Sequence, residues 1–179
     1  MRLGPGSGQL VIRTRREGLA ARVGHDLTID VTRWSAEVVP GGDDLSATTV
    51  TATIALDSFA VREGTGGAMP LTAKDRGEID TTMRRILGTG EATFTSTRVL
   101  PQGDGGVVEG ALRLNGVDRP VRLQVVRDGP DRYRGAATVT QSDFGIKPYS
   151  AFLGALKLRD AVEVEFQVDL STAQQAGAA

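Results

Sequence analysis

His25 is the first candidate for acid–base chemistry or ligand binding in this 179-residue chain, because it is the only histidine. The chain has no cysteine, which excludes a thiol nucleophile, a disulfide and a thiolate metal site. A single histidine also excludes a histidine-rich metal site. Asp26 follows His25 directly, but adjacent residues of a strand point to opposite faces, which argues against a catalytic dyad. We therefore expect no catalytic residue and no metal site.

The other patterns that could support catalysis are weak. Asp43 and Asp44 fall in a predicted turn, and Glu163 and Glu165 lie on the polar face of a predicted strand. No Gly-x-Ser-x-Gly sequence is present to position a serine nucleophile. The glycine-rich runs at 64–67 and 103–106 are not followed by the Lys-Ser/Thr of a phosphate loop. An enzyme that uses His25 as a general base is kept as an alternative hypothesis.

The element that would position His25 is a long predicted strand over residues 19–31, where apolar side chains recur at every second residue. His25 then lies in an inward apolar row, either bonded to the polar end of a ligand or satisfied by a neighbouring hydroxyl or carbonyl. Asp26 would point outward, to an arginine or a turn amide. The apolar parity shifts near Thr32 and Arg33, which predicts a β-bulge or a sharp bend.

The same alternation predicts the remaining strands, and one helix breaks the series. The helix covers about residues 71–87, with an apolar stripe that includes Met83 and Ile86, a capping signal at Thr72 and Asp75, and Gly88 as its stop. A five-residue connection over 115–119 would join two strands as a hairpin. Residues 141–160 are expected to be irregular. The further strands are predicted at 9–15, 50–56, 93–99, 108–114, 121–125, 133–140 and 162–170.

This pattern predicts an all-β fold with one principal helix, in which eight antiparallel strands close into a β-barrel. A sandwich is the alternative. We expect one domain over residues 9–170, a flexible N-terminus over 1–8 and a disordered C-terminal tail over 171–179.

Composition and charge limit the function classes. The net charge of −1 argues against a nucleic-acid partner or a dedicated binder of anionic membranes. No apolar run is long enough for a membrane span, so an integral membrane protein is not expected. The first residues lack the apolar stretch of a signal peptide, which favours a cytoplasmic location.

The inward-facing residues are mostly small, and only eight aromatic residues serve the whole chain. A barrel of this size with such a lining favours an internal cavity, with a core filled by the same side chains as the alternative. Trp34 and Phe94 are expected near its ends, and Phe144, Tyr149 and Phe152 as a lid or plug at one mouth. The lining candidates along the interior are Val23, His25, Leu27, Ile29, Ile54, Leu112, Leu123, Val164 and Phe166.

An ordered set of short motifs resembles one family. The motifs are Gly24-His25-Asp26-Leu27, the stretches 92–99 and 112–121, Ser142-Asp143-Phe144-Gly145-Ile146 and the strand at 162–170. In this order and spacing the chain resembles the YceI-like family over residues 9–170. The chain departs from that pattern around 13–18, where a His-Ser pair is missing, and at 86–91, which lacks the aromatic residues and Tyr-Pro step of many relatives.

The resemblance implies a lipocalin-like barrel whose apolar lumen binds a polyisoprenoid or a similar amphiphilic lipid, such as a quinone. We therefore expect non-enzymatic binding, transport or storage of an isoprenoid-type lipid, with no cofactor. The alternative is a ligand-free structural or partner-binding domain with a filled barrel core. A homodimer is compatible with the resemblance.

Overall fold

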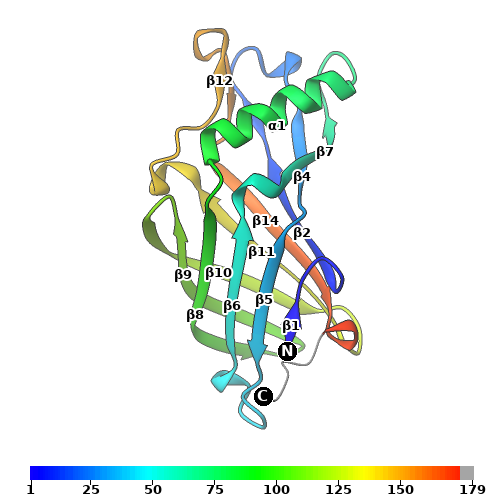
Figure 1. Ribbon diagram of the computed structural model, residues 1–179, viewed down its shortest axis with the longest axis vertical. Coiled ribbons are helices and arrows are strands. Elements are labelled where there is room, and N and C mark those ends of the chain that lie inside the picture. Colours follow the sequence, from blue (N-terminus) through cyan, green and yellow to red (C-terminus); the bar gives the residue numbers. More distant parts are fainter. Residues whose placement is uncertain (174–179) are drawn as a thin grey trace.

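A computed structural model describes residues 1–173 and shows a curled antiparallel sheet with a long helix beside it (Figure 1). Within these residues the large sheet has eleven strands, in the order β1-β5-β6-β8-β9-β10-β11-β14-β2-β4-β7, and a smaller sheet has three, β12-β13-β3. The large sheet comprises β1 (Arg2–Leu3), β2 (Gly8–Thr14), β4 (Asp26–Val31), β5 (Trp34–Val39), β6 (Thr49–Ala55), β7 (Phe59–Thr65), β8 (Glu91–Gln102), β9 (Gly105–Leu114), β10 (Val117–Arg127), β11 (Arg132–Thr140) and β14 (Ala161–Asp169).

The short elements lie mainly at the two ends of the large sheet. The small sheet comprises β3 (Arg16–Glu17), β12 (Ser150–Ala151) and β13 (Leu156–Leu158). The α-helix is α1 (Ala73–Leu87), and the 3-10 turns are η1 (Ala21–Val23), η2 (Leu45–Ala47), η3 (Leu56–Ser58), η4 (Gln141–Phe144), η5 (Phe152–Gly154) and η6 (Leu170–Thr172).

The mostly β architecture with one principal helix is confirmed, but the predicted number of eight strands is not. Three differences account for the eleven strands of the large sheet. The N-terminal residues Arg2–Leu3, assigned above to a flexible lead-in, pair with β5 as β1. Residues 59–65, expected to begin a loop, pair with β4 as β7. The break near Thr32 and Arg33 divides one expected strand into β4 and β5.

More than half of the predicted strand over 19–31 is not a strand. Only Asp26–Val31 forms β4, while Ala21–Val23 forms the turn η1 and the Leu19 side chain is 99% exposed. The turn is held by local hydrogen bonds, from Val23 N to Ala20 O and from Gly24 N to Ala21 O, both 3.1 Å. Gly18 enters this segment with a φ of +98°, a conformation that few other residues adopt. Alternation of apolar residues in a sequence gives no sign of such local hydrogen bonds.

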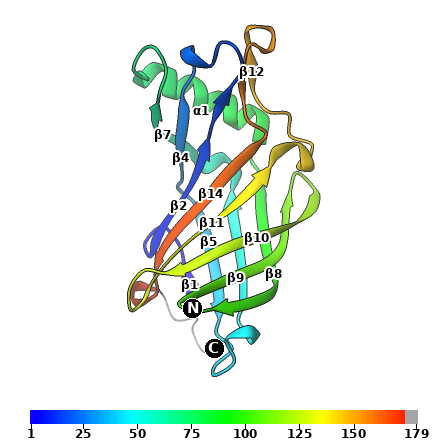
Figure 2. The same ribbon diagram turned by 180° about the vertical axis from the view of Figure 1, so that it is seen from behind.

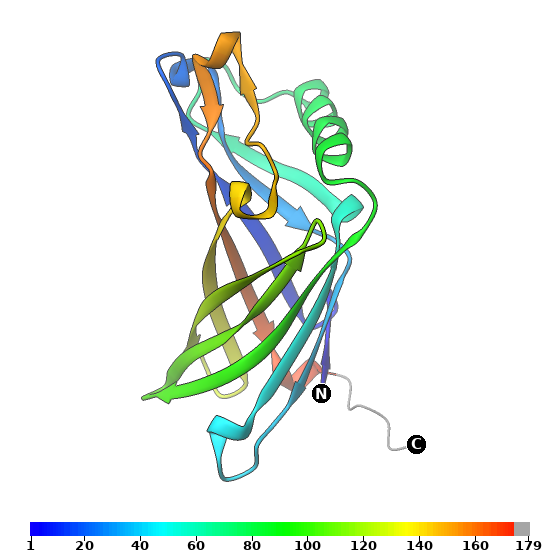
Figure 3. The ribbon, with the colours of Figure 1, turned by 90° about the vertical axis from the view of Figure 1, so that its left-hand side faces the viewer.

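The sheet curls because a two-residue connection joins strands that lie near its two ends. In the strand order, β5 is next to last at one end and β4 is next to last at the other, yet only Thr32 and Arg33 separate them. The bend is fixed by hydrogen bonds from Thr32 N to Ser58 O and from Ala55 N to Arg33 O, both 3.1 Å. Figures 2 and 3 show the resulting curvature, with the strands wrapped around a common interior.

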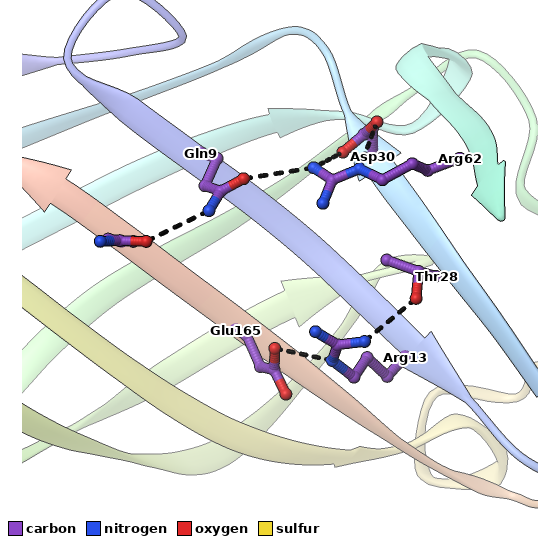
Figure 4. A network of polar contacts seen from close by, with 7 residues as sticks. Gln9, Arg13, Thr28, Asp30, Arg62 and Glu165 are labelled. Atoms are coloured by element: carbon purple, nitrogen blue, oxygen red, sulfur yellow. Dashed lines mark hydrogen bonds and ion pairs between the residues drawn. The ribbon is translucent and has the colours of Figure 1, made fainter.

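Polar side chains mark the outer face of the curled sheet (Figure 4). Arg13 on β2 donates to Glu165 on β14 at 2.8 Å and to Thr28 on β4 at 3.0 Å. Arg62 bonds to the Asp30 carboxylate, and this contact raises the pKa of Arg62. Exposed pairs of this kind add at most about 1 kcal/mol each. Their larger effect is on register, because a one-residue slip would turn them into the apolar interior.

Ten of the buried apolar residues form two clusters. The first joins β4 and β7 to the η3 turn and β8, and the second lies at the η4 turn. The first cluster consists of Leu27, Ile29, Val31, Leu56, Phe59, Val61 and Ala92, and the second of Val139, Phe144 and Ile146. The best-packed parts of the protein therefore flank the interior and do not fill it.

The helix begins and ends as predicted. Thr72 and Asp75 form a capping box, in which Asp75 N donates to Thr72 Oγ1 at 3.1 Å and Thr72 N donates to Asp75 Oδ2 at 2.9 Å. Gly88 terminates the helix with a φ of +74°. Val61 N on β7 donates to Asp80 Oδ1 at 2.9 Å, which ties α1 to the sheet. The whole of α1 is described, and none of its side chains is fully buried.

Two connections differ from their predictions. The β9–β10 hairpin turns in two residues, Asn115 and Gly116, whose φ angles of 52° and 74° are typical of a type I′ turn. The predicted five-residue connection is wrong because Val117–Arg119 already pair with β9. Residues 141–160 contain the β12–β13 hairpin, which pairs with β3. Of the predicted tail, η6 covers Leu170–Thr172, and residues 174–179 lie outside the described part of the chain.

Two glycines provide a matched test of this packing. A Cβ at Gly135 would lie 2.5 Å from both Gln124 O and the Phe166 ring, whereas a Cβ at Gly77 on α1 would meet no atom within 4 Å. We expect Gly135→Ala to lower the free energy of unfolding by about 1–3 kcal/mol through overpacking. Gly77→Ala should raise it by about 0.5–1 kcal/mol through helix propensity. Urea unfolding followed by circular dichroism measures both, and a neutral Gly135→Ala would contradict the described β11–β14 packing.

Candidate functional site

The interior of the curled sheet holds a cavity of about 1070 Å³. It is lined at one end by residues of the turns at 40–48 and 103–106, and at the other end by residues of segments 23–25, 69–71 and 147–158. Figures 1 and 2 place these two groups of turns at opposite ends of the long axis. The cavity therefore runs along the length of the sheet, at the upper end of the usual range of about 300–1,000 Å³ for small-molecule sites.

Some inward-facing apolar side chains that pack against neither core cluster are incompletely covered. Leu123 on β10 and Phe166 on β14 line the cavity and are only half-buried. Inward-facing aliphatic and aromatic side chains of a filled barrel would instead be almost fully buried. These half-buried side chains therefore do not fit the alternative of a filled barrel core.

Eleven of the twelve predicted lining residues border this cavity. They come from η1, the segment before β4, and seven strands, so residues far apart in the sequence converge on one space. They are Val23, His25, Leu27, Ile29, Trp34, Ile54, Phe94, Leu112, Leu123, Val164 and Phe166.

The aromatic residues expected at the ends are placed differently. Phe144 is 2% exposed and packs beside Val139 and Ile146, outside the cavity lining. Trp34 begins β5 at the bend and packs against the first core cluster. Tyr149 borders the cavity at its mouth, whereas Phe152 is 67% exposed and does not line it. These aromatic side chains therefore do not form the expected lid.

His25 lines the cavity beside its mouth and has a backbone partner. Its Nε2 lies 2.8 Å from Met69 O, and because a carbonyl oxygen only accepts, Nε2 carries the hydrogen. In the neutral ring, Nδ1 is then left as an acceptor. The neighbouring Asp26 accepts from Arg16 N of β3 at 2.8 Å and lies 3.8 Å from Arg15 Nη1, an arginine contact of the kind expected for it. His25 thus fixes the loop that carries Met69, and the geometry gives no dyad with Asp26.

Two polar residues near this mouth were not found by sequence reasoning. Arg16 donates from Nη1 to Gly24 O at 2.8 Å and to Thr65 O at 3.0 Å. It therefore joins the segment before β4 to the end of β7. Thr14 lines the cavity, and its buried Oγ1 has no hydrogen-bond partner within residues 1–173. Their place became visible only once β2 was positioned against β4, since no local pattern marks them.

The helix contributes more to the cavity than its sequence indicated. Ile79, Met83 and Leu87 line it, together with Leu71 from the preceding loop. The same side chains pack against the first core cluster, so the apolar stripe both docks the helix on the sheet and forms part of the cavity wall. One side of the stripe borders open space, which explains why α1 has no fully buried side chain.

Among residues 1–173 no group of three or more His, Cys, Asp or Glu side chains is placed to hold a metal ion. No helix in this part of the chain is both long and apolar enough to cross a membrane.

Comparison with known proteins gives a consistent result. Residues 11–170 match the YceI-like domain. The chain belongs to this family. The match extends over almost all of the large sheet and both ends of the cavity, so the YceI-like domain contains all of the candidate site except the lining residues Met1, Leu3 and Leu10.

Curated relatives match the YceI-like domain over a shorter stretch. A UPF0312 protein of Pseudomonas aeruginosa is 40% identical over 65 residues, which are 31% of this chain and 34% of that protein. A UPF0312 protein of Shewanella baltica is 40% identical over 67 residues, 32% of this chain and 35% of that protein. The match therefore spans about a third of the length of these relatives.

Solved structures share the fold. BcnA of Burkholderia cenocepacia superposes with a TM-score of 0.59 at 16% identity, covering 90% of this chain and 94% of that one. A polyisoprenoid binding domain of Saccharophagus degradans, implicated in plant cell wall breakdown, has a TM-score of 0.53 at 16% identity and covers 92% and 98%. At this identity the likeness shows the fold of the YceI-like domain and leaves its ligand to be argued from its own residues.

The start of α1 provides a test of how this wall of the cavity is held. The Thr72 hydroxyl and amide, both hydrogen-bonded to the Asp75 carboxylate, hold the pKa of Asp75 below its usual value. A depressed pKa means that the ionised group stabilises the fold above its unfolded pKa of about 3.9, and that this contribution is lost as pH falls through the folded pKa. We expect Asp75→Asn to speed amide exchange in α1 at neutral pH, with a smaller difference from wild type at pH about 3.

Thr72→Ala should destabilise the same helix start by about 1 kcal/mol. Thr81→Ala is the matched control, because the Thr81 hydroxyl donates to Gly77 O within the helix and caps nothing. Hydrogen exchange of the α1 amides, read by mass spectrometry, distinguishes the two variants. Equal exchange in both would show that the capping box does not hold α1 over the cavity.

Proposed function

We propose that this YceI-like domain binds an amphiphilic isoprenoid-type lipid in the interior of its sheet and acts as a carrier or store for it. The observation that carries the proposal is the long apolar cavity of about 1070 Å³. A chain-like hydrocarbon matches such a space, because its affinity comes from buried area and needs few polar contacts.

The energy available is sufficient. Each methylene group transferred from water is worth about 0.8 kcal/mol, so ten would contribute about 8 kcal/mol before ordering costs are subtracted. A binding free energy of about 8 kcal/mol corresponds to a micromolar dissociation constant. A longer isoprenoid chain would offset the cost of its own ordering by burying further groups.

The polar residues of the lining lie toward the two ends of the cavity. Thr14, Arg16 and His25 lie on neighbouring segments at the mouth beside α1, Thr48 and Asp104 lie at the other end, and the middle is lined by Ile29, Ile54 and similar side chains. This distribution suits a ligand with a long apolar part whose polar group lies at an end of the cavity. The Saccharophagus degradans neighbour, named as a polyisoprenoid binding domain, supports the same ligand class.

The competing functions are less well supported. A partner-binding domain with a filled barrel would not leave Leu123 and Phe166 half-buried around a cavity. An enzyme with His25 as general base would need Nε2 or Nδ1 beside further convergent polar groups, and Nε2 already bonds to Met69 O. A cytoplasmic location and a homodimer remain predictions from the sequence.

Native mass spectrometry of the purified protein tests the proposal directly. A bound mass that is released on denaturation and extracted into organic solvent, with isoprene-like spacing, would support the carrier and identify its cargo. If the purified protein carries nothing, a polyprenol or isoprenoid quinone is added from detergent micelles. No uptake under either condition would overturn the proposal.

Two adjacent residues of β10 give the matched variants. Leu123 faces the cavity and belongs to neither core cluster, whereas Gln124 is exposed on the opposite face. We expect Leu123→Asp to weaken uptake of a polyprenol by more than about 100-fold, because a carboxylate against hydrocarbon costs several kcal/mol. Gln124→Asp should leave uptake unchanged. Circular dichroism confirms folding of both, and retained lipid binding in a folded Leu123→Asp variant would count against the cavity as the site.

A further inference from the structure

Six apolar side chains are exposed around the mouth of the cavity that lies beside α1. We call them the apolar rim: Leu19, Val23, Met69, Tyr149, Phe152 and Leu153. Leu19 is 99% exposed, Met69 74% and Phe152 67%, so these side chains contribute almost nothing to the core. Single exposed apolar residues are ordinary, but several that gather around one opening indicate an interaction surface.

The rim comes from three separate loops that the fold holds together. Ala20 N donates to Ala155 O at 2.9 Å, which joins loop 18–24 to the β12–β13 hairpin. The contact from His25 Nε2 to Met69 O, 2.8 Å, joins loop 66–71 to the start of β4. Figures 1 and 3 show the loop before β4 and the β12–β13 hairpin projecting at the same end of the molecule.

The tip of the β12–β13 hairpin is strained as well as apolar. Phe152 and Leu153 have φ angles of 51° and 53°, a left-handed conformation that is unfavourable for residues other than glycine. This strained backbone holds two apolar side chains in solvent, where they add nothing to the core. Such outliers concentrate where function requires them.

The charge of the same loops is one-sided. Segments 18–24, 66–71 and 147–158 contain Arg22, Lys147 and Lys157 and no acidic residue, although the whole chain has a net charge of −1. None of these three cations forms an ion pair within the part of the chain that the structure describes. Glu17, which is paired with Lys157 across β3 and β13, lies 3.9 Å from Arg159.

We propose that the apolar rim docks this end of the protein on an anionic lipid membrane, so that cargo passes between the bilayer and the cavity mouth. This inference rests on the proposed function for the identity of the cargo as a membrane lipid. Projecting apolar tips flanked by cations are suited to a bilayer interface, where apolar groups enter the headgroup region and cations meet anionic lipid. Val23, Met69 and Tyr149 also line the cavity, so the docking surface and the lipid route are continuous.

A second copy of the chain fits this surface less well. A two-fold symmetric contact would bring the same patch of both copies together, and the cations Arg22, Lys147 and Lys157 of the two copies would then gather in one interface. Such a contact would also close the mouth through which cargo must pass. The membrane provides opposite charge and leaves the route open.

Flotation with lipid vesicles tests the inference. The full chain is expected to bind phosphatidylcholine–phosphatidylglycerol vesicles that contain no isoprenoid, and to bind vesicles of phosphatidylcholine alone more weakly. The triple variant Leu19→Gln, Phe152→Gln, Leu153→Gln should reduce partitioning by about 100-fold. These three residues lie outside the cavity lining, so uptake of a polyprenol from detergent should stay at the wild-type level.

Two further variants define the control and the charge effect. Val39→Gln with Val126→Gln changes exposed apolar residues remote from the rim and should leave flotation unchanged. Replacing Arg22, Lys147 and Lys157 by Gln should weaken binding to anionic vesicles by about fivefold per residue and hardly affect neutral ones.

The possible outcomes separate the two proposals. Wild type that takes up polyprenol from detergent but does not float with either vesicle overturns membrane docking and leaves the proposed function intact. Failure to take up polyprenol overturns the proposed function instead. If sedimentation shows a dimer that the triple rim variant converts to a monomer, with no vesicle binding, the rim is an interface between copies and the inference is wrong.

Discussion

The structure depends on one constraint of chain connectivity, the short link between β4 and β5. Thr32 and Arg33 join strands that lie near opposite ends of the large sheet, so the sheet has to return on itself within two residues. The perimeter is then set by the strands in between, not by the volume of the inward side chains. With mostly Val, Leu, Ala and Ile inside, this perimeter encloses more space than the side chains fill.

A hollow interior shifts stabilisation to other places. The buried clusters are concentrated around the bend, where Leu27, Ile29 and Val31 pack against β7, the η3 turn and β8. On the far side, close contacts between rings and glycines supply packing without filling the lumen. A Cβ at Gly110 would lie 2.5 Å from the Phe94 ring, as one at Gly135 would from Phe166, so each ring occupies the space that a side chain at the glycine would need. The wall is thus thin and well packed while the interior stays open.

Sequence reasoning succeeded where local pattern and tertiary role coincide. The capping box at Thr72 and Asp75, the break near Thr32 and the inward rows of β6, β10 and β14 follow from periodicity and capping preferences, and the structure has them. It could not find Thr14 or Arg16 as lining residues, since their role arises only from pairing between strands distant in sequence. Phe144 misled it because an aromatic residue in an irregular segment carries no sign of whether it is buried in the wall or lies over the mouth.

The largest errors of sequence reasoning fall together at one end of the molecule. Alternation placed Leu19 in the interior, and the aromatic content of 141–160 suggested a lid, yet Leu19, Phe152 and Leu153 are exposed at neighbouring tips. The rule that apolar residues face inward assumes that folding alone selects them, and it fails where an apolar side chain has another task. The apolar residues that line the cavity face inward, as this rule predicts. These exceptions gather at the mouth, beside Arg22, Lys147 and Lys157, and this combination is the physical reason to treat this end of the molecule as an interaction surface.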